Sequence, residues 1–300
     1  MSGQSVNLSE LPYSEQWKIV GYVQIAWFAI VLAAAIASYF KSFSIVKNHF
    51  KGFAVSFTIF STFKLVGGIT STILFKGSTF NSGVYIATYI FDSISLGALL
   101  RSLFPFIQVM LDNGFENQTP PSYVDKDGLL SGTVNNVNQR GGLISGLLTK
   151  TDKNGKPQNP VFRVLFLVVL AAIIISIIGS SKISFTTPSS EANSLLRVSS
   201  ILFIAAIVLL SILLGYIFFT RTEYARFAAI IALAIPFVFI RCLYSVLSSF
   251  HGVSYTSPYL LVFGDYKYYA FMALMCEGIA SIIYLLSLNI FINHYKSLGL

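Results

Sequence analysis

The chain has 300 residues, of which 55% are hydrophobic and 11% are charged, with a mean hydropathy of +0.72 and a net charge of +8. A soluble domain carries about 25% charged residues, so this composition excludes an ordinary soluble protein and predicts a chain embedded in a membrane. The basic residues are scattered through short segments and form no patch with aromatic residues, which argues against nucleic acid as a partner.

Seven apolar segments are long enough to cross the bilayer as helices, because a span needs about 20 mainly apolar residues. In chain order they are 19–40, 52–74, 84–106, 161–179, 198–220, 227–250 and 268–291. Lys64 interrupts the second segment, but the apolar runs on both sides of it fit no other assignment. The predicted fold class is therefore all-α, a polytopic membrane protein with seven transmembrane helices.

The distribution of Lys and Arg predicts the orientation, because cytoplasmic segments carry the excess of positive charge. The segments after the first, third and fifth spans, together with the C-terminal tail, carry eleven Lys and Arg, whereas the segments on the other side carry five. We therefore expect an extracellular N-terminus at 1–18 and a cytoplasmic tail at 295–300. Asn7, in the triplet Asn-Leu-Ser, is a glycan acceptor that agrees with this orientation.

A long segment separates two groups of helices. Helices one to three occupy 19–110, and helices four to seven occupy 161–294. Between them, 111–160 is rich in Gly, Asn, Asp and Lys and has no apolar core of its own, which predicts a flexible cytoplasmic loop.

Four charged residues lie deep within the predicted spans: Lys64, Asp92, Arg241 and Glu277. Each is eight to ten residues from the predicted outer end of its own helix. At 1.5 Å of rise per residue, all four lie about 12–15 Å below the outer boundary. Two cations and two anions are therefore expected in one layer, and the cost of a charge in lipid predicts that they face one another or a wet cavity.

Small and polar residues share the helix faces of these charges at steps of three and four residues. Thr88 and Ser95 accompany Asp92, Tyr244 and Ser245 accompany Arg241, and Ser281 and Tyr284 accompany Glu277. Pro236 is expected to kink the sixth span near the charged layer. Spans two, three, six and seven should then form the core, while spans four and five, with few polar groups, face lipid or a second copy of the chain.

The charged layer has two readings that the sequence leaves open. In one, two ion pairs hold the bundle together, and in the other the layer is a polar pocket or a proton relay. The set balances to zero charge, which favours the first reading, while the intramembrane position favours the second.

Several chemistries are excluded by missing residues. His49, His251 and His294 all lie near the ends of spans, where no two could hold a haem or a zinc ion with a carboxylate. Span seven has no lysine for retinal, no nucleotide-binding or nucleophile-elbow motif precedes a helix, and the D/E-R-Y and N-P-x-x-Y motifs of rhodopsin-like receptors are missing. Cys242 and Cys276 lie within apolar segments and indicate neither a disulfide nor a metal site. We expect no enzyme activity, no cofactor and no metal.

The segment AIPFVFIRCLYSVLSSF, the later MALMCEGIASIIYLL and FSTFKLVGG in span two resemble a family of uncharacterised fungal seven-helix membrane proteins, defined as a domain of unknown function. This resemblance implies a fungal origin and no known activity. More distantly, the R-x-x-Y of Arg241 and Tyr244, followed by Gly252, is similar to the RTA-like fungal proteins proposed to translocate lipids. The acidic residue that usually follows that motif is a serine in this chain.

Three functions remain in competition. The first is a transporter or translocator of an amphipathic molecule or lipid in the plasma membrane, with membrane lipid as its partner. The second is a seven-helix sensor that binds a ligand in the same pocket, and the third is a structural organiser of the membrane. A homo-oligomer through helices four and five is compatible with each.

Overall fold

The computed structural model describes residues 13–45, 51–76, 80–111, 160–183, 190–220, 224–251 and 257–297. The predictions for Asn7 and for most of the loop at 111–160 lie outside these ranges. Among the described residues every regular element is helical, and seven helical spans are long and apolar enough to cross a membrane. The predicted seven-helix membrane fold is therefore confirmed.

The spans are built from the following elements. They are α1 (Ser14–Ile45), α2 (Lys51–Lys76), α3 (Ser82–Ser102), α4 (Phe104–Leu111), α6 (Pro160–Ser181), α7 (Ser190–Thr220), α8 (Ala225–Ala232), α9 (Ile235–His251), α10 (Tyr266–Tyr268), the π-helix η4 (Tyr269–Met275) and α11 (Cys276–Ser297). Three spans are composite, because α3 continues into α4, α8 into α9, and α10 through η4 into α11.

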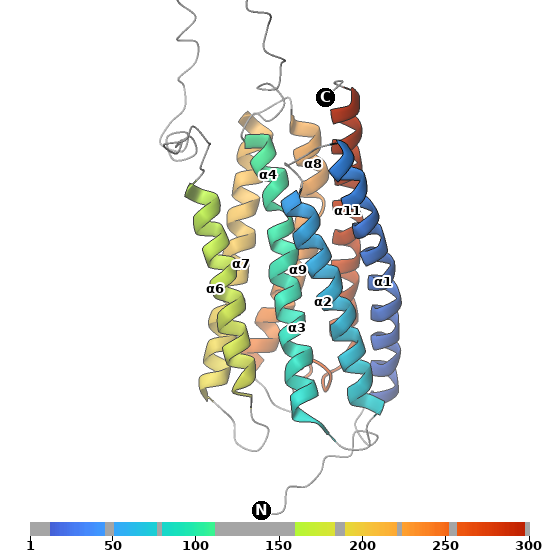
Figure 1. The fold of residues 1–300 in the computed structure, drawn as a ribbon. Helices are drawn as coiled ribbons and strands as arrows, with labels where there is room; N and C mark the ends of the chain where they lie inside the picture. The colour runs from blue at the N-terminus through green and yellow to red at the C-terminus, as the bar shows by residue number, and fades with distance from the viewer. Residues whose placement is uncertain are drawn as a thin grey trace, which may run out of the picture.

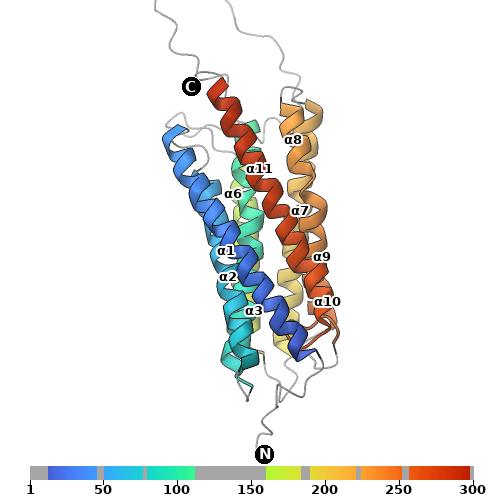
Figure 2. The ribbon, with the colours of Figure 1, turned by 90° about the vertical axis from the view of Figure 1, so that its right-hand side faces the viewer.

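The helices form one closed bundle in which each span packs against the next. Going around it, α1 packs on α2, α2 on α3, α3 on α6, α6 on α7, α7 on α9, α9 on α11, and α11 on α1. Helix α1 begins at the lower end of the bundle in Figure 1, and α11 ends at the upper end. We call these the N-side end, predicted to be extracellular, and the C-side end, predicted to be cytoplasmic; Figure 2 shows the same arrangement from the side of α1 and α11.

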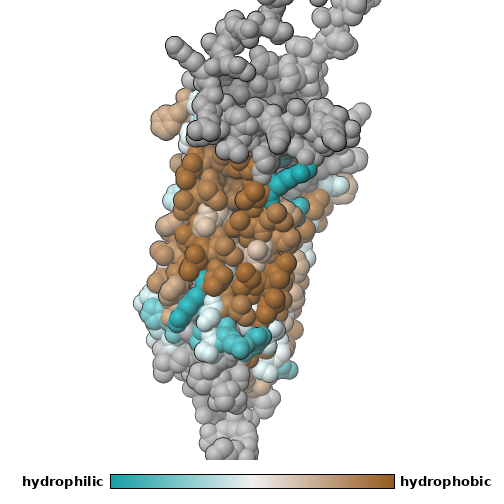
Figure 3. Space-filling model, turned by 90° about the vertical axis from the view of Figure 1, so that its left-hand side faces the viewer, coloured by the Kyte–Doolittle hydropathy of each residue, from teal (hydrophilic) through white to brown (hydrophobic). Residues whose placement is uncertain are grey.

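The outer surface of the bundle is apolar across its middle. Figure 3 shows apolar side chains over this zone on the face that carries α6 and α7, with polar residues nearer its two ends. Leu167 on α6 and Ile212 on α7 are 60% and 62% exposed there. Such a surface is stable against lipid chains and costly against water, so the protein is an integral membrane protein.

The predicted kink in the sixth span is present as a break between α8 and α9. Leu233 and Ala234 form a turn, and Pro236 is the second residue of α9. Proline has no backbone N–H, so it is accommodated in a first helical turn, where no intrahelical partner is needed.

The N-side end is closed by residues 257–265, which fold inward between α9 and α10 and which we call the plug. Leu260, Leu261 and Val262 are each less than 5% exposed. The indole Nε1 of Trp17 donates to the carbonyl oxygen of Gly264 at 2.9 Å, and Val262 has a φ of 74°, a strained value for a β-branched residue. A long-range bond from α1 thus holds the plug in a conformation that its own sequence disfavours.

The C-side half is filled by aromatic side chains, which we call the aromatic core: Phe28, Phe53, Phe57, Phe60, Phe106, Tyr284 and Phe291. Each is at most 1% exposed, and neighbouring rings contact one another. The centroids of Phe53 and Phe106 are 4.8 Å apart, and those of Phe106 and Phe291 are 5.4 Å apart, within the range of favourable aromatic pairs. This half of the bundle is therefore packed without polar contacts between helices at these positions.

Candidate functional site

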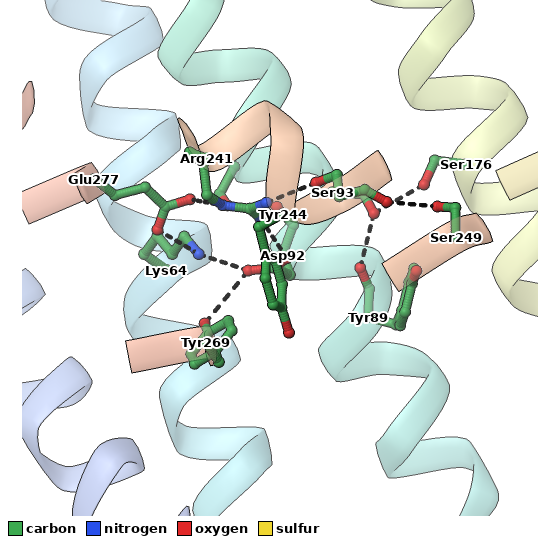
Figure 4. Close-up of polar contacts among 12 residues, drawn as sticks. Lys64, Tyr89, Asp92, Ser93, Ser176, Arg241, Tyr244, Ser249, Tyr269 and Glu277 are labelled. Atoms are coloured by element: carbon green, nitrogen blue, oxygen red, sulfur yellow. Dashed lines mark hydrogen bonds and ion pairs between the residues drawn. The ribbon is translucent and has the colours of Figure 1, made fainter. Parts of the chain in front are cut away.

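Lys64, Asp92, Arg241 and Glu277 meet in the middle of the bundle and form a closed ring of four ion pairs, which we call the charged ring (Figure 4). Lys64 Nζ lies 2.6 Å from Asp92 Oδ1 and 2.6 Å from Glu277 Oε2. Arg241 closes the ring, with Nη2 at 2.5 Å from Asp92 Oδ2 and Nε at 2.7 Å from Glu277 Oε1. Each carboxylate therefore bridges both cations.

Four different helices supply the ring, one residue each from α2, α3, α9 and α11. Because neighbouring helices run in opposite directions, the chain direction alone does not bring the four residues to the same depth in the bundle. Their common depth follows from the position of each charge within its own span. The structure thus brings together all four residues that the sequence singled out. A functional role for the ring stays a prediction.

The ring is almost sealed from its surroundings. The side chains of Lys64, Arg241 and Glu277 are at most 1% exposed, whereas that of Asp92 is 15% exposed. Removing one partner from a buried ion pair costs about 3–5 kcal/mol, because it leaves a charge without compensation. Asp92 is the ring member that an incoming molecule would meet first.

Further polar groups hold the ring in place. The third nitrogen of Arg241, Nη1, donates to Ser245 Oγ at 2.6 Å. The hydroxyl of Tyr269 donates to Gln24 Oε1 at 3.0 Å and lies 3.4 Å from Asp92 Oδ1, while Gln24 Nε2 donates to the carbonyl oxygen of Lys64 at 2.8 Å. With these bonds all three guanidinium nitrogens of Arg241 are satisfied.

Of the predicted supporting residues, some lie at the ring and others do not. Tyr244 and Ser245 lie at the ring, where the face of the Tyr244 ring is 5.6 Å from the Arg241 guanidinium. Thr88 bonds Thr70 across the α2–α3 contact at 2.9 Å, on the N-side of the ring. Ser95, Ser281 and Tyr284 do not bind the ring charges. The two serines donate to the carbonyl oxygens of Asp92 and Glu277 in their own helices, and the buried Tyr284 hydroxyl in the aromatic core has no hydrogen-bond partner.

Two small polar cavities lie on the N-side of the ring and share Asp92 and the plug residue Leu261. The first, which we call the serine cavity, measures about 20 Å³. Its polar lining comes from α3, α6, α7 and α9: Tyr89, Asp92, Ser93, Ser176, Ser199, Ser200, Tyr244, Ser245, Ser248 and Ser249. The second, which we call the Gln24 cavity, measures about 10 Å³ and is lined in part by Gln24, Lys64, Ser71, Thr88 and Tyr269. Each has room for about one water molecule.

A larger hollow of about 430 Å³ opens toward the lipid between α1 and the η4–α11 span; we call it the α1–α11 groove. It is lined by Ile19, Val20, Val23, Trp27, Ala270, Leu274, Met275, Gly278, Ile279 and Ile282. The one polar atom that stands out is Trp27 Nε1, which is buried without a hydrogen-bond partner. A Cβ at position 278 would lie 3.0 Å from that nitrogen, so glycine leaves room for the indole.

The groove and the Gln24 cavity lie back to back. Both are lined by Val20, and the consecutive residues Tyr269 and Ala270 line the cavity and the groove respectively. Tyr269 and Ala270 belong to the π-helix η4, an element that often occurs at functional sites. A thin wall therefore separates an apolar, lipid-facing space from a polar space beside the charged ring.

Sequence reasoning missed several residues of this site. Spans four and five were expected to have few polar groups and to face lipid or a second copy of the chain, yet Ser176 on α6 and Ser199 and Ser200 on α7 turn inward to the serine cavity. Ser176 Oγ donates to Ser93 Oγ on α3 at 2.8 Å. Isolated serines in apolar helices give no signal, because a serine can equally bond its own helix. Gln24 was missed although an amide in the first span could have suggested a partner in the core.

Comparison with known protein families finds a match over part of the chain. Residues 141–289 are similar to a domain of unknown function (DUF7702), which covers the spans from α6 to most of α11 and includes Arg241 and Glu277. Searches of the curated proteins and of the solved structures gave no match. The likeness to an uncharacterised domain family is thus supported, and it brings no activity with it.

Proposed function

We propose that this protein translocates an amphipathic molecule or lipid across the membrane that it spans. The observation that carries the proposal is the position of the α1–α11 groove against the Gln24 cavity, with Val20 in the lining of both. An amphipathic molecule needs an apolar site for its tail and a polar site for its head within one molecular length. The groove and the cavity provide that pair.

The asymmetry of the bundle supports a transport cycle. The N-side holds two polar cavities under the plug, whereas the C-side half is closed by the aromatic core. A transporter that alternates its access needs one side open or easily opened while the other is closed. With the predicted orientation in the plasma membrane, the easily opened side would face the outside of the cell.

The test is lipid movement in vesicles that contain the purified protein. Fluorescent lipids with different head groups are placed in both leaflets, and a membrane-impermeant reductant reports how fast each inner-leaflet lipid reaches the outside. We expect Ala270→Trp, which fills the groove, to reduce that rate at least tenfold. Ile212→Trp, on the lipid-facing surface of α7, is the matched control and should leave the rate unchanged.

Two results would contradict the proposal. Either no lipid in the panel moves faster with protein than in empty vesicles, or Ala270→Trp and Ile212→Trp transport equally well. Thermal melting of both variants shows whether any loss follows from misfolding.

A structural role is the second candidate, because the charged ring is closed and each member already contacts two oppositely charged partners. A ring of this kind fixes the register of four helices without any ligand. The two functions separate in the same vesicles. If the role is structural, Ala270→Trp should leave the rate of lipid movement unchanged. Deleting the protein from cells should then alter the assembly of other membrane components.

A further inference from the structure

We infer that the ligand of the α1–α11 groove is a neutral lipid whose polar end is a single hydroxyl group, an inference that rests on the proposed function. Three properties of the site select this chemistry: the size of the Gln24 cavity, the pairing of all four charges in the ring, and the apolar lining of the groove. The first property excludes bulky head groups, the second excludes ionic head groups, and the third describes the rest of the ligand.

The size of the Gln24 cavity limits the head group. Its volume of about 10 Å³ is near the lower limit for a cavity that holds one water molecule, and therefore one hydroxyl group. A phosphate with its four oxygens, or a sugar, does not fit without moving the ring or Tyr269. A hydroxyl fits once the wall at Val20 moves aside, and it can both donate and accept a hydrogen bond.

The pairing of all four charges in the ring acts against ionic head groups. Every ion-pair distance in the ring is 2.5–2.7 Å, and Arg241 Nη1 is occupied by Ser245. An ammonium would compete with Lys64 and Arg241 for Asp92, and a phosphate would compete with Asp92 and Glu277 for the cations. Either exchange leaves a buried charge unpaired, which reduces binding by roughly a hundredfold or more. A neutral head group leaves the ring intact.

The lining of the groove describes the rest of the ligand. Its volume of about 430 Å³ lies within the usual range for small-molecule sites, and its residues are apolar apart from the indole N–H of Trp27. Ile19 and Trp27 are eight residues apart on α1, so the groove runs roughly 12 Å along that helix. A hydrocarbon body extending from Val20 toward Trp27 therefore fits, and a second charged group along it does not.

The experiment measures quenching of Trp27 by a matched series of brominated amphiphiles. The chain has two tryptophans, and Trp17 also lines the Gln24 cavity, so the series is run on the unmodified protein and repeated in Trp17→Phe, where Trp27 is the sole tryptophan. The probes are 9,10-dibromooctadecan-1-ol, the corresponding primary amine, the corresponding phosphate monoester, and 9,10-dibromooctadecane, which has no head group. We expect saturable quenching by the alcohol at a concentration at least tenfold below that required by each of the other three.

One variant and its control test whether the alcohol binds at the boundary between the α1–α11 groove and the Gln24 cavity. Val20→Phe fills the wall shared by groove and cavity and should raise the half-saturating alcohol concentration at least tenfold. Ile212→Phe, on the far face of the bundle, is the matched control. Should Val20→Phe fail to fold, the four-probe series decides by itself.

Each outcome bears on one of the two proposals. Equal or tighter binding of the amine or phosphate overturns the neutral head group while leaving an amphiphile site in place. Equal quenching by the headless dibromide means that the groove takes any hydrocarbon chain, which also overturns the inference. Saturable binding of the alcohol without its movement across vesicles upholds the inference and contradicts translocation, whereas no saturable quenching by any probe removes the site itself.

Discussion

The two halves of this bundle, on either side of the charged ring, are filled by different kinds of side chain. The N-side half contains serine, threonine and tyrosine hydroxyls around two small cavities, and it is closed by the plug, to which Trp17 of α1 and Tyr244 of α9 each donate a hydrogen bond. The C-side half is packed by seven aromatic side chains, each at most 1% exposed. Phenyl rings offer water no hydrogen-bonding group, whereas hydroxyl groups can exchange one another for water. For the proposed translocation we therefore expect movement to begin on the N-side.

The ring that divides the halves should show the largest effect on stability. We expect Glu277→Gln to lower the free energy of unfolding by about 3–5 kcal/mol, because it leaves Lys64 and Arg241 with one carboxylate between them. Thermal melting in detergent or nanodiscs measures the change. Glu191→Gln, which removes an exposed pair with Lys182, is the matched control and should melt like the unmodified protein.

A double substitution sharpens that result. Adding Lys64→Met to Glu277→Gln removes one charge of each sign, so the remaining Asp92 and Arg241 stay paired. The double variant should lose less stability than the two single variants together. Strictly additive losses would mean that the ring members do not act as one unit.

The C-side half should be the next most sensitive region. Phe57→Ala leaves a cavity among Phe53, Phe60 and Tyr284 and should cost about 3 kcal/mol, measured again by thermal melting. Phe219→Ala is the matched control, since that side chain is 81% exposed at the end of α7. Equal melting of the two variants would mean that the aromatic core does not close this half.

The plug can be tested through access to the serine cavity. In a background of Cys242→Ser and Cys276→Ser, Ser248→Cys reports how fast an impermeant methanethiosulfonate reagent reaches the cavity. We expect Leu261→Ala to speed this labelling about tenfold or more, because truncating a buried leucine costs about 2 kcal/mol or more.

A cysteine at Ser61, on the C-side of the ring, is the matched reporter for that experiment. It should stay unlabelled with or without Leu261→Ala, because Ser61 is fully buried beside the aromatic core. Labelling of Ser61→Cys at the same rate as Ser248→Cys would contradict the difference between the halves. Labelling from only one side of sealed vesicles also tests the predicted orientation.

The smallest expected effect concerns the two tryptophans. Trp17→Phe removes the bond from Nε1 to the Gly264 carbonyl oxygen and should cost about 1 kcal/mol, with a few-fold faster labelling of Ser248→Cys. Trp27→Phe is the matched variant, because its indole nitrogen has no partner to lose. If both variants label alike, the bond to Gly264 does not hold the plug.

The spans could be read from the sequence because hydropathy is a local property, and most of their ends lie within two residues of the prediction, although α7 begins eight residues earlier than predicted. Each span had to be long and apolar enough on its own, so the seven windows matched seven helical spans. The break before α9 was also local, since Pro236 cannot continue a helix that needs its N–H. The predicted sides of the membrane stay a prediction.

The candidate site could be read only in part. Counting along each helix placed four charges in one layer, and the cost of a charge in lipid required partners for them. It could not say whether Lys64 pairs with Asp92, with Glu277 or with both, since that depends on how far apart the four helices stand. The inward serines of α6 and α7 and the amide of Gln24 gave no comparable signal, because a hydroxyl or amide can be satisfied within its own helix or elsewhere.

By itself, the sequence determined the membrane as solvent, the seven spans and the depth of their charges, since each depends on residues close together in the chain. Only the tertiary structure decided the closed ring, the plug and the groove beside the polar cavity. The bond between Trp17 and Gly264 joins residues 247 positions apart, and the wall between groove and cavity brings Val20 of α1 beside the π-helix η4. Such contacts exist only once the bundle has closed, because they depend on packing rather than on local preference.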